Sequence, residues 1–377
     1  MEDKNQLKMN KKNIFCPIIT SKDIGGGIKS TISLLNGLAA LQYNVTVLLP
    51  KDCEFVSKFE PTVNVLYFNE TPSIALSNPL QFYRLCNFTI NIFLQLNKKQ
   101  KTIYFCSDRP ALMLAFLVPK NELLFYISRG WFYTNLSARF LRLFMFPRVN
   151  QFVGISDKQY NLMKSYAPKK AAVHLIQNGI DIPNHTFKPF QKDEIKLATI
   201  GGICDRKNQM QCLDLIALLK DKINVHLNIF GTTFTPIDIA YKKTLEQFIT
   251  ENKLENFVTF KGNETNFDTI YSQSDIVLST AKEEGFGRTI IEAMSYGIPV
   301  IASDKAGGPS TIITHLENGL LYDSSLFDLE QKVLFYLENK VKTAQIIENS
   351  LLLVKQNYTM DRVAKEYANL IDAIELN

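Results

Sequence analysis

The stretch of sequence that decides the fold is residues 283–301, which read EEGFGRTIIEAMSYGIPVI. Two carboxylates, Glu284 and Glu292, stand eight residues apart on either side of the short glycine loop 285–287. Apolar residues at helical spacing follow the loop, and the Gly-Ile-Pro after them predicts the end of a short helix before a buried strand. Because the start of a helix presents backbone N–H groups without intrahelical partners, this loop is suited to bind phosphate.

This pattern resembles the E-x7-E signature of retaining glycosyltransferases with the GT-B fold, most closely glycosyltransferase family four, the glycosyl transferases group 1. The resemblance implies that Glu284 faces the sugar of a nucleotide-sugar donor and that Glu292 hydrogen-bonds its ribose. It also implies that the loop at Phe286, Gly287 and Arg288 contacts the donor. Two glutamates alone would favour a surface turn with solvated carboxylates, so the interpretation depends on the glycines and the Gly-Ile-Pro-Val-Ile run around them.

A second motif, residues 200–208, reads IGGICDRKN. The corresponding family pattern is Gly-Arg-Leu, three variable residues and then Lys, and its Arg and Lys hold the donor pyrophosphate. Lys207 matches, but Gly202 stands at the place of the Arg, and the neighbouring Arg206 is the candidate to supply the missing charge. Adjacent cations at a helix start are unfavourable unless an anion binds there, which favours a phosphate site over a solvated basic pair.

Three consecutive glycines, Gly25, Gly26 and Gly27, separate a predicted strand at 14–19 from a predicted helix at about 28–41. Glycines let backbone approach a pyrophosphate closely at a helix start. The positions after them match neither the dinucleotide-binding fingerprint nor a Walker loop. The resemblance places this triplet near the donor phosphates, and a plain turn is the alternative.

Two further features lie between residues 129 and 148. Arg129 stands where family four often has a His near the C6 hydroxyl of the sugar, and it could contact a donor sugar, an acceptor phosphate or a core carbonyl. The segment 134–148 interleaves three arginines with aromatic and aliphatic residues. Such a segment can lie in a membrane interface, or it can pack as an ordinary helix on the sheet.

Alternating strand and helix patterns predict the α/β class, with two doubly wound Rossmann-like domains. The resemblance implies the GT-B arrangement, in which the two domains face a central cleft. We expect an acceptor-binding domain at 1–183, a nucleotide-sugar-binding domain at 184–359 and a final helix at 360–377 that crosses back to the first domain. The strands are expected near residues 14–19, 45–49, 63–68, 102–106, 123–127, 151–155, 173–176, 197–200, 225–230, 258–260, 276–279 and 299–302.

Length and composition set further bounds. A chain of 377 residues exceeds what one hydrophobic core usually serves, and it contains no apolar run long enough for a transmembrane helix. The six cysteines show no metal-binding spacing and indicate a reduced, cytosolic protein. Residues 1–185 carry 22 Lys and Arg against 11 Asp and Glu, a net charge of +11, whereas the remainder carries −6. This asymmetry predicts that the first half faces an anionic surface.

The resemblance to family four implies a retaining, metal-independent hexosyltransferase in which Glu284, Arg206 and Lys207 are catalytic. It would use a nucleotide-sugar donor, with UDP-sugars favoured, and a glycan or lipid-linked acceptor in bacterial surface polysaccharide or lipopolysaccharide synthesis. No cofactor and no nucleic-acid partner are expected, and the protein would lie on the inner face of the cytoplasmic membrane. Thr311 in place of a family Glu, together with Gly202, leaves open another GT-B enzyme, such as a sugar-nucleotide epimerase or a phosphorylase, or a non-catalytic membrane-associated protein.

Overall fold

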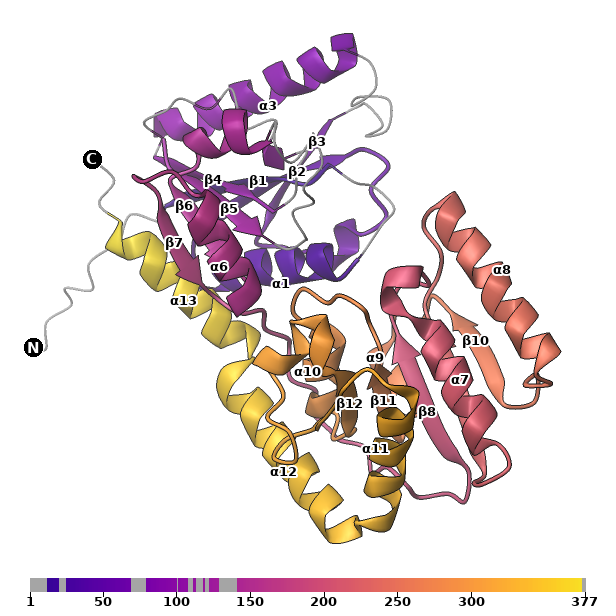
Figure 1. Ribbon diagram of the computed structural model, residues 1–377. Coiled ribbons are helices and arrows are strands. Elements are labelled where there is room, and N and C mark those ends of the chain that lie inside the picture. Colours follow the sequence, from indigo (N-terminus) through magenta and orange to yellow (C-terminus); the bar gives the residue numbers. More distant parts are fainter. Residues whose placement is uncertain are drawn as a thin grey trace, which may run out of the picture. The chain divides into compact units, whose positions relative to one another are not determined.

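The computed structural model describes residues 12–19, 25–68, 79–99, 101–107, 111–112, 118, 122–128 and 141–374. The chain divides into two compact units, each built on its own sheet (Figure 1). Unit 1 comprises residues 1–155, 159–176 and 363–377, and unit 2 comprises residues 156–158 and 177–362.

Unit 1 contains a parallel sheet with the strand order β3-β2-β1-β4-β5-β6-β7. Each strand is a short apolar run bounded by polar residues: β1 Asn13–Pro17, β2 Asn44–Pro50, β3 Asn64–Phe68, β4 Thr102–Cys106, β5 Leu124–Ser128, β6 Gln151–Gly154 and β7 Ala172–Leu175. The helices are α1 Gly26–Ala40, α3 Pro79–Lys99, α6 Asp157–Tyr166 and the C-terminal α13 Met360–Ala373. Buried aromatic rings fill the core. Tyr104 packs edge to face against Phe15 and Phe93, with centroids 5.6 and 5.8 Å apart, and the tilted Phe15–Phe93 pair is 6.4 Å apart.

Helix α13 closes one side of unit 1, although it is the last element of the chain. The Tyr367 ring is buried with its centroid 6.1 Å from that of Phe105 on β4. The Tyr43 hydroxyl donates to the Ala368 carbonyl at 3.3 Å, and Lys12 Nζ donates to the Ile371 carbonyl at 2.8 Å. The core of unit 1 therefore includes both ends of the described chain.

Unit 2 contains a second parallel sheet with the strand order β10-β9-β8-β11-β12-β13. Its strands are β8 Ile195–Ile200, β9 Val225–Phe230, β10 Val258–Gly262, β11 Ile276–Ser279, β12 Val300–Ser303 and β13 Leu320–Tyr322. Its helices are α7 Gln209–Leu219, α8 Pro236–Glu251, α9 Phe267–Tyr271, α10 Arg288–Ser295, α11 Leu326–Glu338 and α12 Lys340–Asn357. The two sheets confirm the predicted α/β class with two Rossmann-like domains. β13 was not among the predicted strands, because its three residues are too few to give a periodic pattern.

The irregular segment between β7 and β8 is hydrogen-bonded to the rest of unit 2 at several points. The Ile180 N–H donates to the Tyr358 carbonyl at 2.8 Å, and the Phe187 N–H donates to the Tyr296 carbonyl at 2.8 Å. Further along, the Asp275 carboxylate accepts the N–H groups of Phe190 and Lys196 at 2.6 and 2.8 Å. Within the described parts of the chain, no helix combines the length and apolarity that crossing a membrane requires.

Candidate active site

The candidate site lies at the edge of the unit 2 sheet where β8, β11 and β12 end. In a parallel sheet these ends share one edge, which is where ligands bind in open α/β folds. The 3-10 helix Asp205–Lys207 follows β8, the loop 280–287 follows β11 and the turn 304–308 follows β12. The three connections therefore meet at one place.

Backbone hydrogen bonds join these three connections. The Lys282 N–H donates to the Arg206 carbonyl at 2.9 Å. Glu284 is bonded on both sides, because its N–H donates to the Ala306 carbonyl and its own carbonyl accepts from Gly308, each at 2.9 Å. The backbone that carries Glu284 is thus fixed independently of any ligand.

The Glu284 carboxylate forms an ion pair with Lys207. Its Oε2 lies 2.5 Å from Lys207 Nζ, and its Oε1 accepts the Gly285 N–H at 3.1 Å. The two side chains are 15% and 18% exposed, so water screens this pair little. Burial raises the pKa of Glu284, but the charge and hydrogen bond of Lys207, with Arg206 nearby, outweigh it and lower the pKa. Glu284 is therefore ionised at neutral pH and can accept hydrogen bonds from hydroxyl groups.

Arg206 connects the same two loops from the other side. Its Nη1 donates to the Glu283 carbonyl at 2.8 Å, and the neighbouring Asp205 pairs with Lys282 at 2.6 Å. A guanidinium has five N–H donors, so this contact uses one of them. The structure thus brings together Arg206, Lys207 and Glu284, the three residues that were predicted to be catalytic.

At Gly202, where the family pattern has an arginine, the structure leaves little room for a side chain. A Cβ atom on Gly202 would lie 3.0 Å from the ring of Phe234, which follows β9 and is 54% exposed. A Cβ on the neighbouring Gly201, whose φ is +136°, would lie 3.3 Å from Lys207 Cε. An arginine at position 202 would therefore need Phe234 to move. Sequence reasoning missed Phe234, because only the fold places it beside Gly202.

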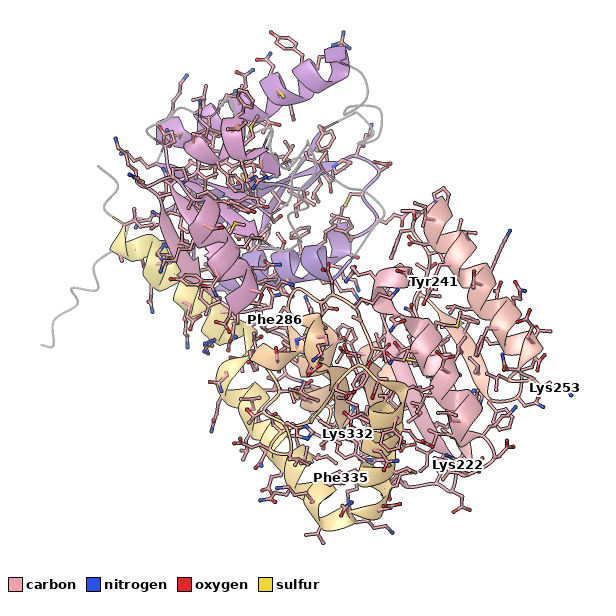
Figure 2. The ribbon with its side chains drawn as sticks, in the orientation of Figure 1. Lys222, Tyr241, Lys253, Phe286, Lys332 and Phe335 are labelled. Carbon is pink, nitrogen blue, oxygen red and sulfur yellow. The ribbon has the colours of Figure 1, made fainter. Side chains whose placement is uncertain are left out.

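The conformation of the loop 285–287 depends on two glycines, Gly287 within it and Gly308 beside it. Gly287 is the N-cap of α10, and its φ of +98° is a backbone conformation that residues with a Cβ rarely adopt. A Cβ on Gly308 would lie 2.7 Å from backbone atoms of Phe286, so only glycine allows the two segments to approach this closely. The Phe286 ring is buried against Tyr358, with centroids 5.8 Å apart (Figure 2). The first turn of α10 is consequently held at the strand ends beside Glu284.

Glu292 is the second carboxylate, two turns into α10 and only 5% exposed. Its Oε1 accepts from Arg288 Nε at 2.6 Å, one helical turn earlier. Its Oε2 accepts from the Tyr271 hydroxyl at 3.4 Å. Both oxygens therefore have a protein partner, and Tyr271, on α9, is a contact that the sequence analysis did not find.

The other predicted residues lie elsewhere. Gly25 caps the start of α1 in unit 1, followed by Gly26 and Gly27 as its first helical residues. Thr311 directs its hydroxyl to the Gly308 carbonyl at 2.7 Å, so it closes the local turn. Arg129 lies outside the described residues. Among the residues that are described, no group of three His, Cys, Asp or Glu side chains could hold a metal ion.

Comparison with known proteins places this geometry in context. Residues 181–351 match the family model of glycosyl transferases group 1. The lipopolysaccharide core biosynthesis mannosyltransferase LpsB of Rhizobium meliloti (strain 1021) is 26% identical over 217 residues, which cover 53% of this chain and 60% of that protein. The poly(ribitol-phosphate) alpha-N-acetylglucosaminyltransferase of Staphylococcus aureus (strain COL) is 27% identical over 203 residues, 53% of this chain and 40% of that protein. Both matches span less than two thirds of the relative's length.

Among solved structures, Anabaena Alr3699/HepE in complex with UDP and glucose superposes with a TM-score of 0.80. It is 20% identical and covers 96% of this chain and 100% of its own. This likeness confirms the GT-B fold that the sequence predicted. The family model falls within unit 2, so the similarity to glycosyl transferases group 1 includes the residues that form the candidate site.

Proposed function

We propose that this chain is a retaining glycosyltransferase that moves a sugar from a nucleotide-sugar donor, with UDP-sugars favoured, to a glycan or lipid-linked acceptor. The observation that carries the proposal is the partly buried Lys207–Glu284 pair beside the start of α10. The matched mannosyltransferase and N-acetylglucosaminyltransferase support a role in bacterial surface polysaccharide synthesis, including lipopolysaccharide. The UDP bound to the structural neighbour supports the choice of nucleotide.

Departure of a nucleoside diphosphate requires positive charge and N–H donors at the pyrophosphate. In the proposed mechanism Lys207 and Arg206 supply the charge, and the N–H groups at the start of α10 supply donors. The Gly25–Gly27 loop of unit 1 would add further N–H groups. In the proposal these groups stabilise the charge that develops on the leaving phosphate, and no metal ion takes part.

Glu284 would position the donor sugar by accepting hydrogen bonds from its hydroxyl groups. The ion pair with Lys207 keeps this carboxylate ionised, which makes it unsuited to act as a proton donor. In the proposed reaction the acceptor attacks from the face that the phosphate leaves, and the leaving phosphate takes the acceptor proton. Glu292 would accept hydrogen bonds from the ribose.

Mass spectrometry of donor hydrolysis over a panel of nucleotide sugars tests this proposal. We expect the wild-type protein to hydrolyse a UDP-sugar slowly in excess EDTA. Proton NMR of the same reaction should show the α-anomer of the sugar released first. Lys207→Ala should slow the reaction by roughly a hundred- to thousandfold. A wild-type protein that hydrolyses none of the panel, or that needs manganese after chelation, contradicts it. Pyridoxal absorbance in the purified protein would instead identify a phosphorylase.

We further propose that unit 1 attaches to an anionic membrane surface. Leu143 and Phe144 are 71% and 53% exposed on a short π-helical turn, Leu141–Met145. The guanidinium of the preceding residue, Arg142, lies 4.4 Å from the centre of the Tyr166 ring. Exposed apolar side chains beside basic residues suit the interface of a membrane that contains anionic lipid, and the first half of the chain carries the excess positive charge.

A further inference from the structure

The carboxylate of Glu292 is held from two directions. Arg288 reaches it from one turn earlier on α10, at 2.6 Å from Oε1, and Tyr271 reaches Oε2 from α9 at 3.4 Å. Tyr271 has no exposed surface. Burial, together with the negative charge of Glu292, raises the pKa of Tyr271. Its hydroxyl therefore stays protonated and donates to the carboxylate.

Stacked rings fix the position of Tyr271. Its ring lies against that of Tyr296, with centroids 4.8 Å apart and an interplanar angle of 22°. Tyr296 also stacks on Phe187, whose ring centroid is 5.7 Å away and whose plane is inclined by only 10°. The Phe187 N–H also donates to the Tyr296 carbonyl. A continuous stack therefore runs from the segment before β8 to the partner of Glu292.

The polar edges of the stack are anchored as well. The Tyr296 hydroxyl donates to Asp268 Oδ1 at 2.8 Å, and His185 Nε2 lies 3.5 Å from the same oxygen. Asp268 belongs to α9, the helix that carries Tyr271. The hydroxyl of Tyr296 bonds to Asp268 and its ring stacks on Tyr271, and both partners belong to α9. These two contacts fix the position of α9 relative to the end of α10.

From this arrangement we propose that Tyr271 is a positioning residue that orients the Glu292 carboxylate toward the donor ribose, and that the Phe187–Tyr296 stack holds it in place. This inference rests on the proposed role of Glu292 as the ribose ligand. The terminal torsion of a glutamate is soft, so a carboxylate fixed at one oxygen can still rotate. With Arg288 on one oxygen and Tyr271 on the other, its plane is set, and the remaining lone pairs can accept ribose hydroxyls.

The test compares UDP with 2′,3′-dideoxy-UDP by calorimetric titration, because the second ligand lacks the ribose hydroxyls. We expect wild-type protein to prefer UDP and Glu292→Gln to lose that preference. Tyr271→Phe should reduce the preference by roughly three- to tenfold, the range for a hydrogen bond of moderate strength, without changing the affinity for dideoxy-UDP. Tyr336→Phe is the matched control, since its buried hydroxyl donates to the Val300 carbonyl at 2.9 Å and should not affect the preference.

Phe187→Ala is the second variant, because it leaves every polar group near Glu292 intact and Phe187 itself is only half-buried. It should weaken the UDP preference in the same direction as Tyr271→Phe, but less. If Glu292→Gln removes the preference while Tyr271→Phe and Phe187→Ala keep the wild-type ratio, the positioning role is wrong and the proposed function stands. If Tyr271→Phe does not fold, an unchanged ratio in Phe187→Ala decides against the inference. Wild-type protein without any preference for UDP overturns the ribose assignment itself.

Discussion

The two units have the same architecture but differ in what they place after their first strand. In unit 2 the connection after β8 carries Lys207, whose ammonium is bound to a carboxylate from a connection 77 residues away. In unit 1 the corresponding connection ends in glycines, and the hydroxyls of Ser30 and Thr31 bond back to the carbonyls of Gly26 and Gly27 within α1. Shared sheet topology therefore does not determine chemistry, which depends on the side chains that each set of loops presents.

The sharpest way to test this comparison is Lys207→Ala. Removing one aimed donor from the proposed pyrophosphate site should lower kcat/KM by roughly a hundred- to thousandfold, about 3–4 kcal/mol of transition-state stabilisation. Lys222→Ala is the matched control, because Lys222 forms an ion pair of the same length, 2.5 Å, with the buried Glu330 elsewhere in unit 2 (Figure 2). Steady-state transfer rates that fall equally in both variants would remove Lys207 from the mechanism.

A pair of glycine substitutions compares the two units directly. Gly308→Ala forces a Cβ to within 2.7 Å of the Phe286 backbone, whereas a Cβ on Gly26 meets nothing within 4 Å. We expect Gly308→Ala to cost about 1–3 kcal/mol of stability, the usual range for overpacking, and to weaken UDP binding. Gly26→Ala should leave the stability unchanged or raise it by up to about 1 kcal/mol, since alanine favours helix. Thermal unfolding and calorimetry measure both, and equal losses would contradict the contrast.

The pH dependence of stability offers a smaller effect with a definite sign. The pKa of Glu284 lies below its ordinary value of 4.5 in the folded protein, so the ionised carboxylate stabilises the fold at higher pH. That contribution is lost as pH falls through the folded pKa, below 4.5. The free energy of unfolding in urea should therefore be measured for the wild type and Glu284→Gln from pH 7 downward. We expect the difference between them to be constant near neutral pH, and the wild type to lose stability relative to the variant in acid. Parallel curves throughout would mean that the ion pair does not depress this pKa.

The smallest expected effect concerns unit 1. Replacing both Leu143 and Phe144 by Ser should reduce binding to vesicles containing anionic lipid by about fivefold, roughly 1 kcal/mol for partial insertion of apolar side chains. Tyr83→Ser is the control, since Tyr83 is 65% exposed on α3 of the same unit. Sedimentation at low and high salt separates the apolar contribution from the screened electrostatic one. A double variant that sediments like the wild type would exclude this turn from the membrane contact.

The sequence allowed prediction of the features that depend on local pattern. Short apolar runs located the strands, and the helix after Gly287 was predicted because glycine, apolar spacing and Gly-Ile-Pro all agree there. The pairing of Arg288 with Glu292 could also have been predicted, because residues four apart in a helix lie next to each other on its surface.

Contacts set by tertiary packing could not be predicted. α9 has only five residues and shows no usable periodicity, so the position of Tyr271 beside Glu292 follows from the fold alone. The same holds for Phe234. Its ring limits the space for a side chain at position 202, but this is evident only once β8 and β9 are paired in the sheet.

Helix α13 has a consequence for how the protein acquires its structure. Unit 1 begins with the first strand, yet its aromatic core is completed by residues from 363 onward, so it cannot finish folding until those residues have been synthesised. Unit 2 is continuous from 177 to 362 apart from three earlier residues, and its contacts are correspondingly more local. We therefore expect the second unit to be the first to reach its native state during synthesis, with the β4 surface around Phe105 left open to chaperones until Tyr367 arrives.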